Sequence, residues 1–238
     1  MEAQRRSERA AHTHVLIAVK ELRLAKSRLA QSLSAGDRTD LVSAMLRDTL
    51  TTLVGAGIGT DPQSGITVVT PDPAVAAIAD EYGVRHWPDP GRSNPDASGL
   101  NAALVAAEAG LESDPARTDL VALQADLPAL RADELLDALA AARQVGRAIV
   151  VDHTGTGTAA LFACGPGTTL DPRFGIDSAA RHIASGAHAL EGNWPGLRQD
   201  VDTIADLTAA ARLGLGPETL AVLERVACTS GVRGPLLP

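Results

Sequence analysis

Aromatic side chains and positive charge are scarce in this sequence. Its 238 residues include two Trp, two Phe and one Tyr, and 21 basic residues against 29 acidic ones give a net charge of −8. Proteins that hold nucleic acid combine positive charge with aromatic platforms on which bases stack. We therefore expect no nucleic-acid partner, and a core built from aliphatic side chains.

Cysteines and long apolar runs are also lacking. Cys164 and Cys228 lie far apart without a CxxC pair, which argues against a disulfide framework or a zinc site. No run approaches the ~20 apolar residues of a membrane-spanning helix, and residues 1–13 lack the apolar stretch of a signal peptide. We expect a cytoplasmic protein with no membrane partner, in which a flexible leader (1–13) and a loose C-terminal tail (227–238) flank one domain at 14–226.

Short apolar runs alternate with segments of helical periodicity along the first two thirds of the chain. Runs typical of buried parallel strands lie at 14–19, 66–70, 120–124 and 148–152. Segments with apolar residues at three- and four-residue intervals lie at 38–54, 73–82, 99–111 and 132–144. This alternation predicts right-handed βαβ units in one α/β domain with a mostly parallel, doubly wound sheet.

The alternation changes after Asp152. The sequence then predicts a short strand at 159–164, a helix at 177–185, a last strand at 198–201 and a final helix at 203–213. We interpret the stretch that begins after Asp152 as a small inserted lobe that binds an acceptor substrate.

A basic segment follows the first expected strand. In an open parallel sheet, ligands bind beyond the carboxyl ends of the strands. Lys20, Arg23, Lys26 and Arg28 fall within nine positions of an otherwise acidic protein, directly beyond the strand at 14–19. This place favours a polyanionic ligand over the alternative, a charged loop that is merely solvated.

Acidic side chains follow two other expected strands. Asp126 stands just beyond the strand at 120–124, and Asp200 and Asp202 end the strand expected at 198–201, where alternation would place both on one face. Magnesium is commonly held by carboxylates together with substrate phosphates. Asp126 and Asp202 could instead cap the helices that follow them. The preferred interpretation is a magnesium site made by three carboxylates.

Two glycine-containing loops and one helix start are further candidates for binding small anions. The run GTGT ends at Thr158, and the loop at 173–178 contains Gly175 and Ser178. Glycine lets backbone amides approach an anion, and a helix N-terminus attracts one. Asn101 lies in the first turn of an expected helix, where it could contact a base or ribose. The alternatives are ordinary loops and helix caps.

These segments together resemble one family, the phosphoenolpyruvate or 2-phospho-L-lactate guanylyltransferases of coenzyme F-420 (deazaflavin) biosynthesis. The resemblance extends from about residue 14 to about residue 215, in order and with compatible spacing. The segments that carry it are VLIAVK (15–20), AKSRL (25–29), AMLRD (44–48), QADLP (124–128), GTGT (155–158), RFGIDS (173–178) and DVD (200–202). Two departures are Ala125, where some relatives have Gly, and the leader before residue 14.

The resemblance implies a nucleotidyltransferase fold of the glycosyltransferase-A type. GTP would donate GMP to the phosphate of a three-carbon acid, pyrophosphate would leave, and the product would pass to the next enzyme of the pathway. The Ala-rich composition resembles actinobacterial members, which use phosphoenolpyruvate and form enolpyruvoyl-2-diphospho-5'-guanosine. The alternative acceptors are 2-phospho-L-lactate and 3-phosphoglycerate.

The resemblance also implies roles for individual residues. Those that would hold magnesium are Asp126, Asp200 and Asp202. Those that would bind the acceptor are Thr158, Gly175 and Ser178. Those that would lie along the GTP triphosphate and act in catalysis are Lys20, Lys26 and Arg28. Asn101 would lie near the guanosine.

Two other functions remain as alternatives. A transferase acting on a molybdenum cofactor or a sugar phosphate usually has a glycine-rich loop after the first strand, and the segment 20–29 contains no glycine. A non-catalytic nucleotide sensor could dispense with the metal, whereas all three aspartates are present here.

Overall fold

A seven-stranded sheet forms the centre of the computed structural model, which describes residues 12–22, 26–59, 64–88, 99–111 and 119–230. The strands follow the spatial order β3-β2-β1-β4-β6-β5-β7. Their bounds are β1 Thr13–Ala18, β2 Gly65–Thr70, β3 Arg85–Pro88, β4 Asp119–Leu123, β5 Arg147–Val151, β6 Thr158–Cys164 and β7 His188–Ala189.

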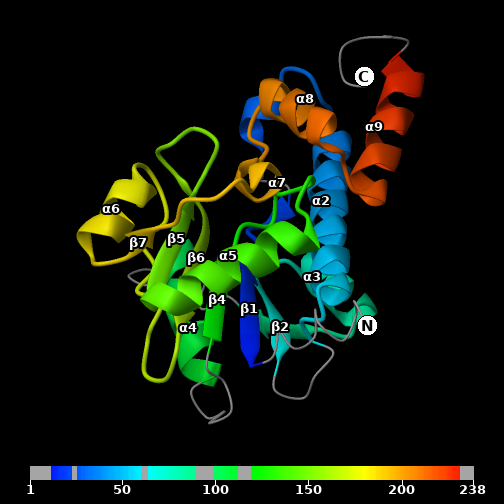
Figure 1. Ribbon diagram of the computed structural model, residues 1–238. Coiled ribbons are helices and arrows are strands. Elements are labelled where there is room, and N and C mark those ends of the chain that lie inside the picture. The colour runs from blue at the N-terminus through cyan, green and yellow to red at the C-terminus, as the bar shows by residue number, and fades with distance from the viewer. Residues whose placement is uncertain (1–11, 23–25, 60–63, 89–98, 112–118, 231–238) are drawn as a thin grey trace.

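Helices cover both faces of this sheet (Figure 1). Their bounds are α2 Ala35–Gly55, α3 Pro73–Glu81, α4 Leu100–Leu111, α5 Ala132–Val145, α6 Ser178–Ala184, α7 Pro195–Arg198, α8 Ile204–Leu213 and α9 Pro217–Ser230, and a 3-10 turn, η2, spans Ser27–Leu29. The expected single α/β domain with a doubly wound sheet is confirmed.

Six of the strands run in one direction. β1 pairs in parallel with β2 and β4, β2 with β3, and β5 with β7. β6 is antiparallel to both of its neighbours, β4 and β5. The carboxyl ends of β1, β2 and β4 therefore meet at one edge, where the loops after them lie side by side.

Successive residues of β1 supply two separate cores. Val15 and Ile17 belong to the larger apolar cluster, which includes residues of α2, α3 and α5, whereas Leu16 belongs to the smaller one, with α4 and α6. Adjacent side chains of a strand point to opposite faces. Burial on both faces explains why the central strands are continuous apolar runs in the sequence.

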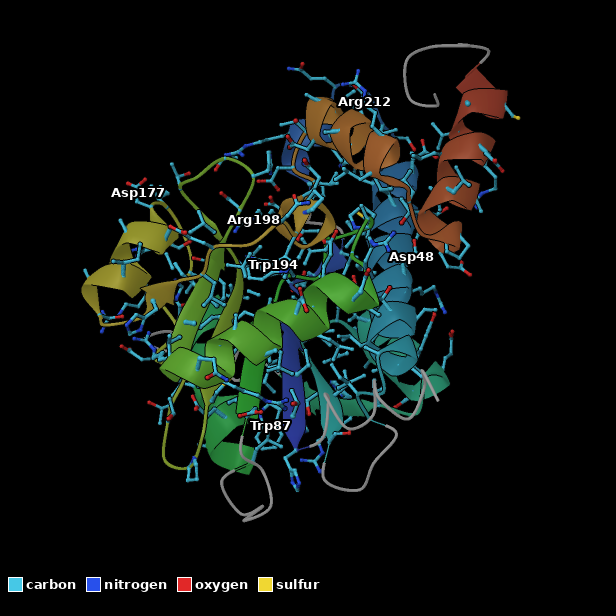
Figure 2. The ribbon with its side chains drawn as sticks, in the orientation of Figure 1. Asp48, Trp87, Asp177, Trp194, Arg198 and Arg212 are labelled. Carbon is cyan, nitrogen blue, oxygen red and sulfur yellow. The ribbon has the colours of Figure 1, made fainter. Side chains whose placement is uncertain are left out.

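The strand expected at 198–201 is absent, and this prediction is wrong. Pro195 starts the short helix α7 instead, which ends at Arg198. The Arg198 guanidinium donates to the carbonyl oxygens of Val151 at 2.6 Å and Leu190 at 3.2 Å, and it lies 5.8 Å from the centre of the Trp194 ring (Figure 2). These contacts hold α7 against the end of β5 without the backbone hydrogen bonds of a paired strand.

The segment after Asp152, interpreted from the sequence as a small inserted lobe, shares the sheet with the rest of the domain. β6 returns from β5 and takes a central place between β4 and β5. The rest of the segment, with α6 and β7, lies at the β5 edge of the sheet (Figure 1). The same loops expected to bind an acceptor are thus attached directly to the sheet.

The expected ends of the domain are only partly within the described residues. Thr13, the last residue of the expected leader, is buried and starts β1, whereas residues 1–11 lie outside the described part. Helix α9 continues through the expected boundary at Val226 to Ser230, and 231–238 also lie outside it. Within the described ranges, no helix has both the length and the apolar character needed to cross a membrane.

Asp48 of α2 anchors the last helix. Its carboxylate accepts the backbone N–H groups of Glu218 at 3.0 Å and Thr219 at 2.8 Å, at the first turn of α9 (Figure 2). A carboxylate at this place satisfies amides that have no partner within the helix and interacts favourably with its dipole. Asp48, which belongs to the AMLRD segment, therefore has a structural role.

Candidate active site at the carboxyl edge of the sheet

The loops after β1 and β4 meet the segment between α7 and α8. Asp126 lies just beyond the end of β4, and its carbonyl oxygen accepts the N–H of Val201 at 3.2 Å. This bond places Asp200 and Asp202, on either side of Val201, next to Asp126. The structure thus brings the three predicted aspartates together, although not by the strand that the sequence suggested.

Lys26 lies between two of these aspartates. Its ammonium group contacts Asp126 Oδ2 and lies 2.8 Å from Asp202 Oδ1, and its side chain is only 9% exposed. Burial lowers the pKa of Lys26, but the charges of Asp126 and Asp202 raise it further, so its pKa lies above the usual value. The lysine is therefore a fixed positive charge within the carboxylate cluster.

The backbone of Lys26 has a left-handed conformation, with φ of 54°. Residues other than glycine seldom adopt this conformation, and the surrounding contacts must hold it. The two ion pairs of the side chain supply such contacts. The other predicted cations differ: Arg28 is largely exposed and lies 3.3 Å from Asp202 Oδ2, and Lys20 is exposed just beyond β1.

One oxygen of Asp126 is buried and has no hydrogen-bond partner among the described residues, namely Oδ1. A buried carboxylate oxygen without a partner is costly, and a cation would satisfy it. The described residues contain no group of three or more His, Cys, Asp or Glu arranged to hold a metal ion as they stand. Lys26 lies between Asp126 and Asp202, and Asp200 is bonded elsewhere, so a bound magnesium would require these side chains to rearrange.

Asp200 is bonded to a histidine that the sequence did not single out. His153 Nδ1 lies 2.9 Å from Asp200 Oδ1, and its Nε2 lies 3.2 Å from Asp206 Oδ1. Burial and the negative charges of Asp126 and Asp152 raise the pKa of Asp200 to about 6, against the opposing effect of His153. Ionised Asp200 is therefore held in an unfavourable environment near neutral pH.

Replacing Asp200 by Asn should stabilise the protein in EDTA near neutral pH. Between 3.8 and about 6, the native state binds more protons than the unfolded chain, so the free energy of unfolding falls as pH rises through this window. At about pH 7, the free energy of unfolding of Asp200→Asn, measured in urea, should exceed that of the wild type by up to about 3 kcal/mol. The difference should vanish towards about pH 4. Asp40→Asn, which changes an exposed pair with Arg225, is the control. An equal pH dependence in the wild type and Asp200→Asn would contradict the prediction.

The helix caps expected as alternatives for Asp126 and Asp202 are not formed. Helix α5 has Arg131 at its N-cap, and α8 begins with a capping box made by Thr203 and Asp206. Asp206 Oδ2 also accepts the N–H of Asp202 at 3.0 Å. The carboxylates of Asp126 and Asp202 are thus left for charged partners.

The residues predicted to bind the acceptor form a second cluster. Ser178 Oγ donates to Thr158 Oγ1 at 3.1 Å, and the N–H of Ser178 donates to the carbonyl oxygen of Gly175 at 3.1 Å. Gly175 has φ of 120°, which favours glycine. Thr158 and Ser178 are buried, and the carbonyl of Thr156 accepts the N–H of Ala179 at 3.0 Å. The GTGT loop and the 173–178 loop are therefore joined.

Asn101 belongs to this second cluster. Its Oδ1 accepts the N–H of Phe174 at 2.7 Å, and its Nδ2 donates to the Phe174 carbonyl oxygen at 3.0 Å. Both polar groups of the side-chain amide are used by the loop. The structure shows Asn101 as a support of that loop, and its place near the guanosine stays a prediction.

Sequence reasoning missed His153 and His182. His182 is buried, with Nδ1 lying 3.0 Å from Thr158 Oγ1. It follows Ser178 by four positions on one helix, a spacing that places two residues on the same face. That spacing was the available signal. For His153, the signal was its position directly beyond β5.

An open cavity of about 420 Å³ lies beyond the ends of β2 and β3. Residues from Thr70 to Asp80 line it on the side of α3, and His86 and Pro88 line it on the side of β3. Asp72, in its wall, accepts the N–H of Leu22 at 2.9 Å through Oδ2. This bond connects the cavity to the segment after β1.

Comparison with known proteins agrees with this architecture. Residues 42–190 match the family model described as the MobA-like NTP transferase domain. The chain is 53% identical over 232 residues to phosphoenolpyruvate guanylyltransferase 1 of Rhodococcus jostii, covering 94% of this chain and 98% of the relative. It is 50% identical over 209 residues to the phosphoenolpyruvate guanylyltransferase of Mycobacterium marinum, covering 88% and 92%.

Solved structures show the same fold at low sequence identity. A candidate nucleotide-diphospho-sugar transferase from Desulfovibrio desulfuricans G20 has a TM-score of 0.68 at 16% identity, covering 92% of this chain and 96% of that one. The 4-diphosphocytidyl-2C-methyl-D-erythritol synthase of Anaerococcus prevotii has a TM-score of 0.53 at 12% identity, covering 88% and 98%. The expected nucleotidyltransferase fold is thereby confirmed.

Proposed function

The chain belongs to the phosphoenolpyruvate guanylyltransferases of the MobA-like NTP transferase family, and we propose that it condenses GTP with phosphoenolpyruvate in coenzyme F-420 biosynthesis. The products are enolpyruvoyl-2-diphospho-5'-guanosine and pyrophosphate. The main support is identity of 50–54% to relatives of that name over about nine tenths of the chain. Such similarity extends through both clusters of the candidate site.

The reaction is an in-line transfer of GMP. An oxygen of the acceptor phosphate attacks the α-phosphorus of GTP, a new P–O–P bond forms, and the bond to the pyrophosphate leaving group breaks. The acceptor phosphate is already ionised, so no general base is required. Catalysis then depends on positioning two polyanions and neutralising their charge.

The cations after β1 suit the donor triphosphate. Lys26 is held at the aspartate cluster, and Arg28 and Lys20 lie in the same segment with more exposure. In the proposed mechanism, these three residues lie along the triphosphate and stabilise the leaving pyrophosphate. Lys26 is the residue best placed to contact the reacting phosphates, because it lies between Asp126 and Asp202.

The aspartate cluster suits magnesium. Asp126, with its unsatisfied Oδ1, would hold the ion together with Asp202 and Asp200. Bound there, magnesium would neutralise the charge that builds up on the phosphates during transfer. In the same proposal, Thr158, Gly175 and Ser178 bind the acceptor. The GTGT loop follows His153, which is bonded to Asp200, and this loop is joined to the 173–178 loop through Thr156 and Ala179.

The cavity beyond β2 and β3 offers space for the guanosine. It lies at the same edge of the sheet as the segment after β1, to which Asp72 connects it. Asn101, whose amide is used by Phe174, is less suited to this role. The two cysteines are free, which fits a proposed place in the cytoplasm, where the product would pass to the next enzyme of the pathway.

The proposal predicts pyrophosphate release from GTP and magnesium when phosphoenolpyruvate is added. Parallel reactions with 2-phospho-L-lactate and 3-phosphoglycerate test the acceptor, and coupling to the next biosynthetic enzyme prevents product inhibition from hiding turnover. Release with phosphoenolpyruvate alone is the expected result. Preference for another phosphoacid would correct the acceptor and keep the mechanism. If GTP binds but no phosphoacid causes pyrophosphate release, the result would favour a nucleotide sensor. A transferase for a molybdenum cofactor or a sugar phosphate would release pyrophosphate only with an acceptor of its own class.

A further inference from the structure

His182 lies between the acceptor cluster and the backbone of the loop at 173–178. It is fully buried, and its ring packs edge-on against Phe174, with ring centres 5.2 Å apart. Nδ1 lies 3.0 Å from Thr158 Oγ1, and Nε2 accepts the backbone N–H of Arg173 at 2.8 Å. One ring therefore joins the strand that carries Thr158 to the loop that carries Gly175.

The bond to Arg173 determines which nitrogen of His182 carries the proton. A backbone N–H can only donate, so Nε2 must be unprotonated to accept it. In the neutral ring, the proton is then on Nδ1, which donates to Thr158 Oγ1. A protonated ring would place a second N–H against the N–H of Arg173, and this contact would be lost.

The groups around His182 favour this neutral form. Burial lowers the pKa of His182 to about 4, and the positive charges of Arg147 on β5 and Arg181 on α6 act in the same direction, while a hydrogen bond with the backbone of Ser178 and the charge of Asp171 oppose them. The ring is therefore neutral at the pH at which a phosphoacid is doubly ionised. Its hydrogen-bond pattern is fixed in that range.

A count of protons shows what this pattern does for the acceptor hydroxyls. Thr158 Oγ1 accepts from His182, and the bond between the hydroxyls of Thr158 and Ser178 uses one of their two protons. One hydroxyl proton is left over, and it can donate to an anion. Without the N–H of His182, Thr158 would be free to turn, and this donor would lose its orientation.

The backbone of the loop is held in the same way from two sides. Asn101 forms hydrogen bonds with the backbone N–H and the backbone carbonyl oxygen of Phe174, and His182 accepts the backbone N–H of the preceding residue, Arg173. Gly175, which is predicted to approach the acceptor, follows directly. Its left-handed backbone is thus attached to a fixed anchor, so the loop need not be ordered when the substrate binds.

We propose that His182 is a positioning residue for the acceptor phosphoacid, which orients the Thr158 and Ser178 hydroxyls and holds the Arg173–Phe174 backbone through its Nδ1–H tautomer. This inference rests on the proposed function, because it assumes that these hydroxyls meet the acceptor. His182 itself does not touch the reacting atoms. Its effect should appear in acceptor binding and leave GTP binding unchanged.

Two substitutions of His182 test the contacts of the ring. His182→Asn places an amide where Nδ1 lies and can still donate to Thr158, whereas His182→Ala loses both contacts. We expect His182→Ala to raise the KM for the acceptor by about tenfold or more, with the KM for GTP changed less than about twofold. His182→Asn should recover most of the acceptor KM. His188→Gln, which changes an exposed histidine on β7, is the matched control and should behave as the wild type.

A double-mutant cycle tests the route through Thr158 even if His182→Ala folds poorly. Thr158→Val keeps the shape of the side chain and removes the hydroxyl. His182→Gln, whose longer side chain places its amide where Nε2 lies, loses the contact with Thr158 and should raise the acceptor KM by itself, but it should change the acceptor KM no further when added to Thr158→Val. If the wild type turns over, two results would overturn the inference. One is that the effects of the two substitutions on the acceptor KM are additive, and the other is that the KM values for the acceptor and for GTP change equally. A wild type that releases no pyrophosphate with any phosphoacid would instead overturn the proposed function, and the acceptor role of His182 with it.

Discussion

Replacing Asp126 by Asn should lower kcat by at least about 10²-fold, the largest effect expected of any single substitution in this chain. The change keeps the size of the side chain and removes one negative charge at the site proposed for magnesium. It also removes the charge that faces Lys26. Phosphates that the ion would otherwise neutralise then repel each other during transfer, so the loss appears mainly in kcat.

Pyrophosphate release at saturating GTP and acceptor measures this effect, and thermal unfolding measures the folded fraction. Asp126 is not in an apolar core cluster, so the variant should fold. Lys26 keeps its ion pair with Asp202 in this variant, which limits the loss of stability. Asp40→Asn is again the control, because Asp40 is exposed and pairs with Arg225, which is not a residue of the site. A folded Asp126→Asn protein with a kcat near that of the wild type would refute the metal role of Asp126.

The sequence predicted the central strands because they are buried on both faces. Val15, Leu16 and Ile17 supply two cores from consecutive positions, and such continuous apolar runs are readily recognised. The edge strands were missed for the opposite reason. β3 has the sequence RHWP and is largely exposed, and β7 has two residues. Neither carries a pattern that distinguishes it from a loop.

The aspartate cluster was predicted from a correct principle and one wrong element. The rule that ligands lie beyond the carboxyl ends of strands placed Asp126 correctly. Asp200 and Asp202 were assigned to a strand that does not exist, yet they reach the cluster through the bond between Val201 and Asp126. The alternation of side chains at Asp200 and Asp202 was weak evidence for a strand, because the segment is too short to show a period. A single backbone hydrogen bond, from Val201 to Asp126, is enough to hold it in place.

The partners of the site residues could not be derived from the sequence. Lys26 meets Asp126 across 100 positions and Asp202 across 176, and only the folded sheet brings these segments together. His182 differs, because its four-residue spacing from Ser178 on α6 was visible. The ends of the strands, which the sequence predicts, thus indicate where the site lies. Which charged side chains pair with one another there depends on contacts between residues far apart in the sequence, and only the structure shows them.

Replacing Lys26 by Met should lower both turnover and stability, and magnesium should restore only the stability. Without the ammonium group, Asp126 and Asp202 are left as two nearby carboxylates that repel each other. Loss of one partner of a largely buried pair costs about 3 kcal/mol, which corresponds to a fall in Tm of roughly 5–10 °C in EDTA. Because a cation that binds only the folded state stabilises it, magnesium should raise the Tm of Lys26→Met more than that of the wild type.

Turnover of Lys26→Met should stay at least about 10²-fold below the wild type with saturating magnesium, since the ion cannot replace a lysine on the leaving pyrophosphate. Arg28→Met is the matched control: Arg28 is 72% exposed and lies 3.3 Å from Asp202, so its loss should change stability by no more than about 1 kcal/mol. Differential scanning fluorimetry with EDTA and with magnesium compares the three proteins directly. An equal magnesium shift in the wild type and Lys26→Met would mean that the lysine and the ion do not share Asp126 and Asp202. A larger shift in the variant would place both at the same carboxylates, with the lysine neutralising them until the nucleotide brings its metal.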